Sequence, residues 1–183
     1  SSDVIFRPGE HDGKLTPRVT ALAAMLSAIA PSEATDNLWG ERWSKLSQNA
    51  MSNPVQAMSG LGSVEVLSLE AGRTLSILLA AESARVGLKL GYKIPNYGGA
   101  APEKWASADQ RSTYQELDRQ LTPTSEPRLN WRSSMAQDVL KGRRTEIDFM
   151  NGHIVDMGRE GGVATPVSTA VVGVVREIDA DQR

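Results

Sequence analysis

The chain has 183 residues, enough to bury a sizeable core within a single domain. Its formal net charge of -2 provides no electrostatic case for binding nucleic acid or an anionic membrane surface. It contains no cysteine, which excludes disulfides and thiolate metal sites. Its two histidines, His11 and His153, are not at metal-ligand spacing, so we expect both to be incidental and no metal to be bound.

No secretory signal opens the chain, and no apolar run is long enough to cross a bilayer. The most apolar run, 75–81, is short and is bracketed by Arg73, Glu82 and Arg85. We therefore expect a soluble, cytoplasmic protein with no membrane partner. Because the chain does not begin with methionine and opens on a polar segment, we expect it to be part of a longer protein.

The first predicted helix follows a short strand or extended segment at 4–6. Thr16 and Pro17 are typical of a helix start, a hydroxyl cap followed by proline at the first helical position. The helix should end at Pro31. Its apolar face is predicted to contain Val19, Leu22, Met25, Leu26 and Ile29.

Two more helices are predicted in the first half of the chain. One begins near Asp36, and Pro54 should kink or end it, because proline lacks a backbone donor and clashes with the preceding turn. The other should run from Ser63 or Ser68 to about Leu90, where Gly91 stops it. One face of this long helix contains Leu75, Leu78, Leu79 and Val86.

The composition changes between residues 92 and 131. Two loops rich in proline and small residues, 95–102 and 122–127, flank a modest polar helix at about 108–121, and we interpret the region as an insertion or flap. Two further helices are predicted, one at about 145–159 and one starting at Thr165-Pro166. Because no convincing alternating strand pattern is found, the predicted fold class is all-α.

Two groups of polar residues indicate a site for a small polar substrate. Lys45, Asn49 and Asn53 recur every four residues, which places them on one helix face. A solvated face is the simpler interpretation, but two tryptophans on the same helix must be buried beside this stripe. The second group lies within 133–152, which combines hydroxyls, an amide, carboxylates and basic groups.

Carboxylates near apolar faces need a partner or a ligand. Glu146 falls beside the apolar stripe of the predicted helix 145–159, whereas Asp148 should face solvent. Glu82 lies on the apolar face of the long helix. It is either half of a buried ion pair with an arginine or a group that tunes a nearby active lysine.

Together these residues resemble the C-terminal domain of the ketopantoate reductase (2-dehydropantoate 2-reductase) family. The family pattern reads approximately W-x-K-L-x-x-N-x-x-x-N, then S-M-x-Q-D-x-x-x-G-R-x-T-E-I-D-x-x-N-G, then G-x-x-T-P. The chain matches it in order at Trp43, Lys45, Leu46, Asn49 and Asn53; Ser134, Met135, Gln137, Asp138, Gly142, Arg143, Thr145, Glu146, Ile147, Asp148, Asn151 and Gly152; and Gly162, Thr165 and Pro166.

The resemblance implies that residues 1–183 form an all-helical substrate-binding domain, similar to the C-terminal domain of 6-phosphogluconate dehydrogenase. It also implies an N-terminal Rossmann domain that binds most of the NADPH cofactor. That domain looks to be missing, since the chain has no Gly-x-Gly-x-x-Gly. Family members often pair through the helical domain, so a homodimer is expected.

The implied activity is reduction of ketopantoate to pantoate, on the way to pantothenate and coenzyme A. The catalytic residues would be Lys45, which donates a proton to the carbonyl oxygen, and Glu146, which accepts a hydrogen bond from a substrate hydroxyl and helps to place the lysine. Asn49, Asn53 and Ser134 would bind the substrate, with Ser134 suited to its carboxylate.

One departure from the family pattern leaves the choice of substrate open. Trp131 stands where some members have a substrate-contacting asparagine, and Asn130 is one place off. Two alternatives to ketopantoate reduction therefore remain. One is a paralogue that reduces another 2-keto acid, and the other is a non-catalytic helical dimerisation module in which the polar stripes are structural.

Overall fold

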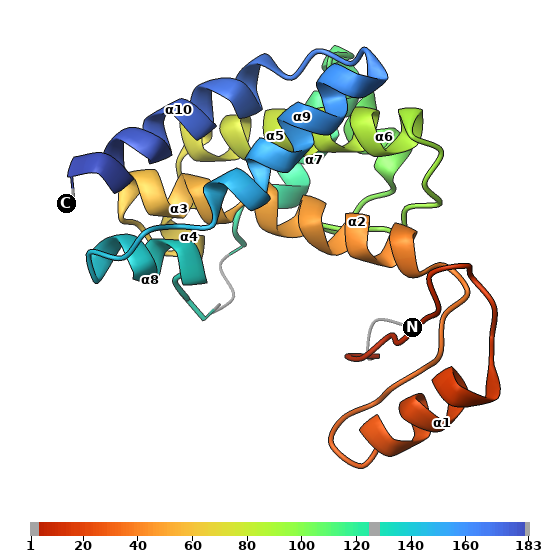
Figure 1. Cartoon of the computed structure of the whole chain (residues 1–183). Coiled ribbons are helices and arrows are strands. Elements are labelled where there is room, and N and C mark those ends of the chain that lie inside the picture. The colour runs from red at the N-terminus through yellow and green to blue at the C-terminus, as the bar shows by residue number, and fades with distance from the viewer. Residues whose placement is uncertain (1–3, 125–128, 182–183) are drawn as a thin grey trace.

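The computed structural model describes residues 4–124 and 129–181, which form ten α-helices and one short 3-10 helix without a β-sheet (Figure 1). This confirms the predicted all-α class. The elements are α1 (Pro17–Leu26), α2 (Leu38–Ala50), α3 (Asn53–Ser59), α4 (Ser63–Ser68), α5 (Glu70–Lys89), α6 (Pro102–Ala106), α7 (Arg111–Leu121), α8 (Ser134–Leu140), η1 (Ile147–Phe149), α9 (Asn151–Gly161) and α10 (Pro166–Asp181).

The central element of the helical body is α5, which contacts α2, α4, α6, α7, α9 and α10. Its Ile77, Leu79 and Val86 side chains are fully buried, as expected for a helix covered on several sides. Gly87 allows α2 to approach closely, because a Cβ atom at this position would overlap the indole nitrogen of Trp43. The sequence of α5 therefore determines how near α2 can lie.

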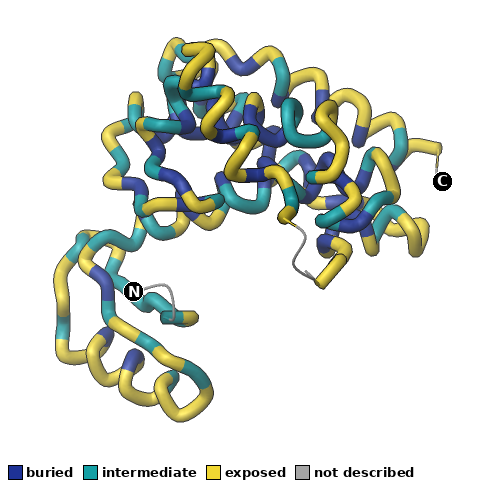
Figure 2. The backbone as a smooth tube through the Cα atoms, turned by 180° about the vertical axis from the view of Figure 1, so that it is seen from behind, coloured by how far each residue is buried: buried dark blue, intermediate teal, exposed yellow. Residues whose placement is uncertain are grey.

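Residues 4–36, called the arm below, extend away from this body (Figures 1 and 2). Two extended segments of the arm run parallel to each other, with bridges from Phe6 to Ser32 and from Gly9 to Thr35. They are joined by α1, so the arm has the connectivity of a β-α-β unit. Parallel pairs of this kind normally lie inside larger sheets that are covered on both faces.

The start of α1 agrees with the prediction, but the environment of its apolar face does not. The Thr16 hydroxyl accepts a hydrogen bond from the Val19 N–H at 3.3 Å. Val19 is buried within the arm, whereas Met25 is 73% and Ile29 76% exposed. The described residues thus leave most of this face uncovered, as the exposed colouring of the arm shows in Figure 2.

Two helix boundaries in the first half of the helical body differ from the predictions, one between α2 and α3 and one between α4 and α5. Pro54 does not only end α2; it stands in the first turn of a new helix, α3. The predicted helix from Ser63 to Leu90 is interrupted at Leu69, whose ψ of 131° is extended, so α4 and α5 are separate. The predicted stop is confirmed, because Gly91 follows the end of α5 with a φ of 80°.

The region 92–131 belongs to the core and is not the flap that we predicted. Both α6 and α7 pack against α5. The fully buried Trp105 donates its indole N–H to the Tyr97 carbonyl oxygen at 2.9 Å, and the Tyr97 hydroxyl donates to the Ala80 carbonyl oxygen at 3.0 Å. Burial raises the pKa of Tyr97 above its ordinary value. The predicted loop 122–127 lies partly outside the described residues.

Candidate active site

Helix α2 has one face in the core and another toward the candidate site. On the core side, the Trp43 indole N–H donates to the Ser83 carbonyl oxygen at 3.0 Å, and the Ser47 and Ser83 hydroxyls are hydrogen-bonded at 2.6 Å. Because an α-helix turns by about 100° per residue, Lys45 and Gln48 then project away from the core. Packing of the tryptophan thus sets the direction of the lysine.

Lys45 is exposed and lines a hollow between α2 and the arm. Ile5 and Arg7 of the arm, Gln48 of α2, and Tyr97 also line this hollow. Within the described residues, the Lys45 ammonium has no hydrogen-bond or ion-pair partner. Within the described part of the chain the ammonium is thus available to a ligand, and its catalytic role stays a prediction.

The predicted stripe on α2 is broken before its last member. Because Pro54 has no N–H, the Ala50 carbonyl oxygen lacks the donor that a continuous helix would supply. Asn151 Nδ2 donates to that carbonyl oxygen at 3.1 Å instead. Asn53 therefore begins α3, where it is buried, whereas Asn49 stays on α2 and is only partly buried.

Ser133 caps α8, so Ser134 stands at the start of this helix. The Ser133 hydroxyl accepts a hydrogen bond from the Ala136 N–H at 3.2 Å. The Ser133 N–H donates to Gln56 Oε1 at 2.9 Å, and its hydroxyl donates to the Asn53 carbonyl oxygen at 3.4 Å. Through these bonds, the start of α8 is tied to the start of α3.

Ser134 is the first residue of α8 and is exposed. Its hydroxyl donates to Glu146 Oε1 at 3.5 Å, the outer limit of a hydrogen bond. The structure thus brings Ser134 and Glu146 together, close to Asn53. Among the described residues, no hydrogen bond or ion pair joins Glu146 to Lys45.

The predicted environments of Glu146 and Asp148 are wrong. Glu146 is exposed, whereas Asp148 is partly buried and ion-paired with Arg176 at 2.7 Å and with Arg144 at 3.2 Å. The hydrogen bond from Arg176 is the main cause that lowers the pKa of Asp148, and the Arg144 bond adds to it.

The error arises because we predicted one continuous helix at 145–159 and derived the directions of Glu146 and Asp148 from it. Residues 145–150 do not continue into α9, because η1 occupies 147–149 and the α-helix begins only at Asn151. The buried Asp179 carboxylate holds the turn by accepting hydrogen bonds from the Thr145 N–H at 3.1 Å and hydroxyl at 2.9 Å. No local signal identifies a partner that lies 34 residues further along the chain.

Glu82 has a different partner from either of those we proposed. Its carboxylate is 4% exposed and accepts hydrogen bonds from the Val167 N–H at 2.8 Å and the Ser168 N–H at 2.7 Å. These are N–H groups in the first turn of α10, which have no partner inside the helix. Glu82 therefore caps α10, and the helix N-terminus stabilises its charge.

The structure also identifies polar residues that sequence reasoning missed. Gln48 follows Lys45 by three residues and thus shares its helix face. This spacing is visible in the sequence and could have identified Gln48. Its Oε1 accepts a hydrogen bond from the Gly98 N–H at 2.6 Å. Gln56 gave no signal, because α3 was not expected.

Asn130 cannot stand in for the absent asparagine of the family pattern, because its side chain is engaged elsewhere. Its Oδ1 accepts a hydrogen bond from the Val64 N–H at 3.0 Å, and its Nδ2 donates to Glu65 Oε2 at 3.1 Å. Both bonds hold the start of α4. A Cβ atom at Gly62 would overlap the Asn130 amide, so the glycine makes room for this contact.

None of the helices in 4–124 and 129–181 combines the length and the apolar character needed to cross a membrane. In the same ranges, no three histidine, aspartate or glutamate side chains form a group suited to a metal ion.

A family model and the curated relatives reported below point to one family. The family model described as "Ketopantoate reductase PanE/ApbA C terminal" matches residues 37–179. The chain is 28% identical to a 2-dehydropantoate 2-reductase of Archaeoglobus fulgidus, over 94% of the chain and 52% of that protein. It is 27% identical to one of Mesorhizobium japonicum, over 97% of the chain and 48% of that protein.

A solved structure shows the same arrangement of helices. The crystal structure of 2-dehydropantoate 2-reductase from Methylococcus capsulatus superposes with a TM-score of 0.73 at 25% identity. The match covers 96% of the chain and 55% of that structure. The chain thus spans about half the length of the curated relatives it matches.

Proposed function

Because the chain belongs to the ketopantoate reductase C-terminal domain family, we propose that it is the substrate-binding and catalytic domain of an NADPH-dependent reductase. The reaction would convert ketopantoate to pantoate, for the synthesis of pantothenate and coenzyme A. A paralogue that reduces another 2-keto acid is the second candidate. A non-catalytic dimerisation module is not favoured, because the chain belongs to a family of reductases.

The observation that supports this proposal most directly is the state of the Lys45 ammonium. It lines the hollow on α2 and has no partner in the described part of the chain. Reduction of a keto group creates negative charge on its oxygen, and a positioned ammonium both stabilises that charge and delivers the proton. In the proposed reaction, the proton moves from Lys45 Nζ to this oxygen, leaving a neutral amine and the hydroxyl of the product.

The remaining candidate residues are assigned to binding and positioning. The partly buried Asn49 amide would hydrogen-bond the substrate without the cost of burying a charge. Asn53 and Ser134, tied together through Ser133, would bind at the other end, with Ser134 near the carboxylate. The exposed Glu146, within reach of the Ser134 hydroxyl, would accept a hydrogen bond from a substrate hydroxyl.

NADPH, the proposed source of hydride, would be held mainly outside this chain, by the preceding Rossmann domain. A pyrophosphate needs a glycine-rich turn that opens onto a helix N-terminus. The turn before α1 instead carries Glu10, whose carboxylate accepts a hydrogen bond from the Thr16 hydroxyl at 2.6 Å and pairs with Arg18 at 2.6 Å. That carboxylate would repel a phosphate.

The domain arrangement is part of the same proposal. We assign 1–183 to the C-terminal half of the enzyme, with a Rossmann domain preceding it. The arm would be where the two halves meet, since its parallel segments and the uncovered face of α1 suit packing against a parallel sheet. The family model begins at residue 37, directly after the arm.

The test compares this chain with the natural full-length protein. The full-length protein should oxidise NADPH in the presence of ketopantoate or a related 2-keto acid, measured by absorbance. The 183-residue chain should show no turnover and no submicromolar NADPH binding by calorimetry. Tight NADPH binding by the short chain, or no activity of the full-length protein toward any 2-keto acid, would contradict the proposal.

A further inference from the structure

Tyr97 and Ala100 flank a tight turn whose central residues are glycines, called the double-glycine turn below. Gly98 and Gly99 have φ values of 57° and 81°, and positive values at both central positions are typical of a type I′ turn. The Tyr97 N–H donates to the Ala100 carbonyl oxygen at 3.1 Å, and the Ala100 N–H donates to the Tyr97 carbonyl oxygen at 3.0 Å. A Cβ atom on Gly98 would lie 2.9 Å from the Trp105 ring, so this packing requires glycine.

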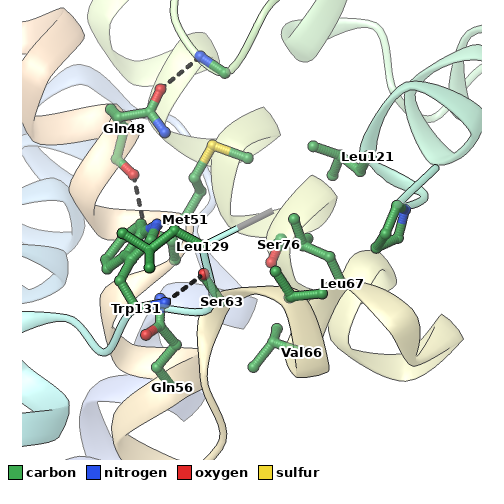
Figure 3. A pocket seen from close by; sticks show the side chains of 14 residues that line it. Gln48, Met51, Gln56, Ser63, Val66, Leu67, Ser76, Leu121, Leu129 and Trp131 are labelled. Carbon is green, nitrogen blue, oxygen red and sulfur yellow. Dashed lines mark hydrogen bonds between the residues drawn. The ribbon is translucent and has the colours of Figure 1, made fainter. Parts of the chain in front are cut away.

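Two glutamine side chains hold the double-glycine turn at Gly98. The Gly98 N–H donates to Gln48 Oε1 at 2.6 Å, and Gln120 Nε2 donates to the Gly98 carbonyl oxygen at 2.7 Å. Figure 3 shows the Gln48 bond as a dashed line, beside a cavity that this residue also lines. Because a backbone N–H can only donate, the oxygen of the Gln48 amide must face the turn. The turn is thus attached to α2 through one glutamine and to α7 through the other.

The attachment to α2 borders the candidate active site. Gln48 follows Lys45 by three residues, so their side chains are neighbours on the same helix face. Both line the hollow beside the arm, together with Asn96 and Tyr97, which lead into the turn. Gln120, by contrast, is exposed on α7. The bond from Gly98 to Gln48 therefore fixes the position of the 96–97 wall relative to Lys45.

We propose that Gln48 is a positioning residue of the substrate site. It holds the double-glycine turn so that Asn96 and Tyr97 form one wall of the hollow in which a 2-keto acid reaches Lys45. The inference rests on the proposed function, because that function places the keto group at Lys45. Without Gln48 Oε1, the N–H of the partly buried Gly98 would lack its acceptor, and the turn would shift to expose this group to water.

This role predicts a specific kinetic effect. In the proposed site Gln48 does not contact the reacting atoms, and the wall contacts the substrate equally in the ground state and in the transition state. Loss of the bond to Gly98 should therefore raise KM for the 2-keto acid and leave kcat nearly unchanged. A hydrogen bond that serves only stability would change the unfolding of the protein and neither kinetic constant.

The first experiment compares the two glutamines in the full-length protein, with ketopantoate or the 2-keto acid that it reduces best. Gln48→Met keeps an unbranched side chain but removes the acceptor, and should raise KM for the keto acid about tenfold, the scale of one buried hydrogen bond. Gln48→Asn, whose amide is one methylene too short for the contact, should do the same. In both variants kcat and the KM for NADPH should change less than about twofold.

Gln120→Met is the matched control, because it removes the other side-chain hydrogen bond of Gly98 from an exposed position. All of its kinetic constants should stay within about twofold of wild type.

The second experiment restores the acceptor. Gln48→Glu keeps an oxygen that can accept the Gly98 N–H, and an ionic strength of about 1 M, where the Debye length is about 3 Å, screens the added charge. At this ionic strength, KM of Gln48→Glu should lie within about threefold of wild type, whereas Gln48→Met stays about tenfold above it. Urea unfolding of each variant checks that it is folded.

The outcomes separate this inference from the proposed function. A fall in kcat without a rise in KM, a rise in the KM for NADPH instead, or kinetics equal to wild type in Gln48→Met would overturn the positioning role and leave the reductase proposal standing. Equal effects of Gln120→Met, or a KM of Gln48→Glu as high as that of Gln48→Met, would overturn it as well. If the full-length protein reduces no 2-keto acid, the proposed function itself fails, and the inference fails with it.

Discussion

At the scale of single residues, Lys45 carries the proposed chemistry most directly. In the full-length enzyme, Lys45→Ala should lower turnover about 100-fold or more, the range expected for loss of a general acid. Folding should be unaffected, because the ammonium is exposed and has no partner among the described residues. Lys89→Ala, an exposed lysine at the end of α5, is the control. Near-normal turnover of Lys45→Ala across pH would show that the lysine belongs to a solvated face.

Glu146 and Asp148 allow a comparison within one short segment. Glu146→Ala should reduce catalytic efficiency about 10- to 100-fold, corresponding to about 1.5–3 kcal/mol for a hydrogen bond to a charged group. Asp148→Ala should leave kcat/KM nearly unchanged, because its carboxylate is engaged by Arg144 and Arg176.

For stability the order of the two effects should be reversed: Asp148→Ala should destabilise the protein more than Glu146→Ala does. Loss of the Asp148 ion pairs should reduce the free energy of unfolding by about 1 kcal/mol, as for other pairs near the surface. Removal of the exposed Glu146 side chain should have little effect on urea unfolding. Equal kinetic losses in the two variants would indicate a general charge effect and contradict the role of Glu146.

At the scale of elements, the break between α2 and α3 depends on Asn151. Its amide replaces the donor that Pro54 cannot supply to the Ala50 carbonyl oxygen. Asn151→Ala should therefore reduce the free energy of unfolding by about 1–3 kcal/mol, the cost of a buried unsatisfied polar group. The exposed Asn96 is the control, since Asn96→Ala should change urea unfolding by less than about 0.5 kcal/mol. Equal unfolding midpoints for the two variants would contradict this role.

The start of α10 depends on Glu82 in a comparable way. Glu82→Ala removes both acceptors of the Val167 and Ser168 N–H groups and should destabilise the protein by about 3 kcal/mol. Glu82→Gln keeps one acceptor oxygen and should lie between the alanine variant and the wild type. Glu160→Ala, which removes an exposed carboxylate, controls for charge. If urea denaturation shows that Glu82→Ala is as stable as Glu160→Ala, then Glu82 does not stabilise the start of α10.

At the scale of the whole molecule, we expect a homodimer. Apolar side chains that could form the interface remain exposed on α5 and α10: Leu78 is 38% and Val174 45% exposed, although Val171 is buried and Leu75 partly so. Phe149 of η1 is also exposed, at 81%. Light scattering of the full-length protein at micromolar concentration should give the mass of two chains. A monomer mass would contradict the proposal.

The arm provides a control for this measurement. If the uncovered face of α1 packs on the preceding domain, Met25→Asp should weaken that packing without changing the dimer. The mass should therefore stay that of a dimer, while proteolysis between the two halves becomes faster. Conversion to a monomer would place the subunit interface on the arm instead.

Much of the helical framework was predictable from local patterns. The Thr16-Pro17 start, the Gly91 stop and the Thr165-Pro166 start each depend on the geometry of a few adjacent residues, and each was located correctly. Local patterns could not show that 92–131 joins the core, because Trp105 and Tyr97 are buried by contacts with α5 rather than by their own periodicity.

The sequence alone determined the all-α class, the family and the set of candidate residues, because helix periodicity and motif order are local properties of the chain. The tertiary structure decided how those residues are arranged. Asn53 lies on a different helix from Asn49. Pro54 leaves the Ala50 carbonyl oxygen without its helical donor, and this oxygen accepts a hydrogen bond from Asn151, 101 residues away. The sides of Glu146 and Asp148 are reversed because Thr145 is held by Asp179. Such partners meet only through long-range packing, and no local pattern records them.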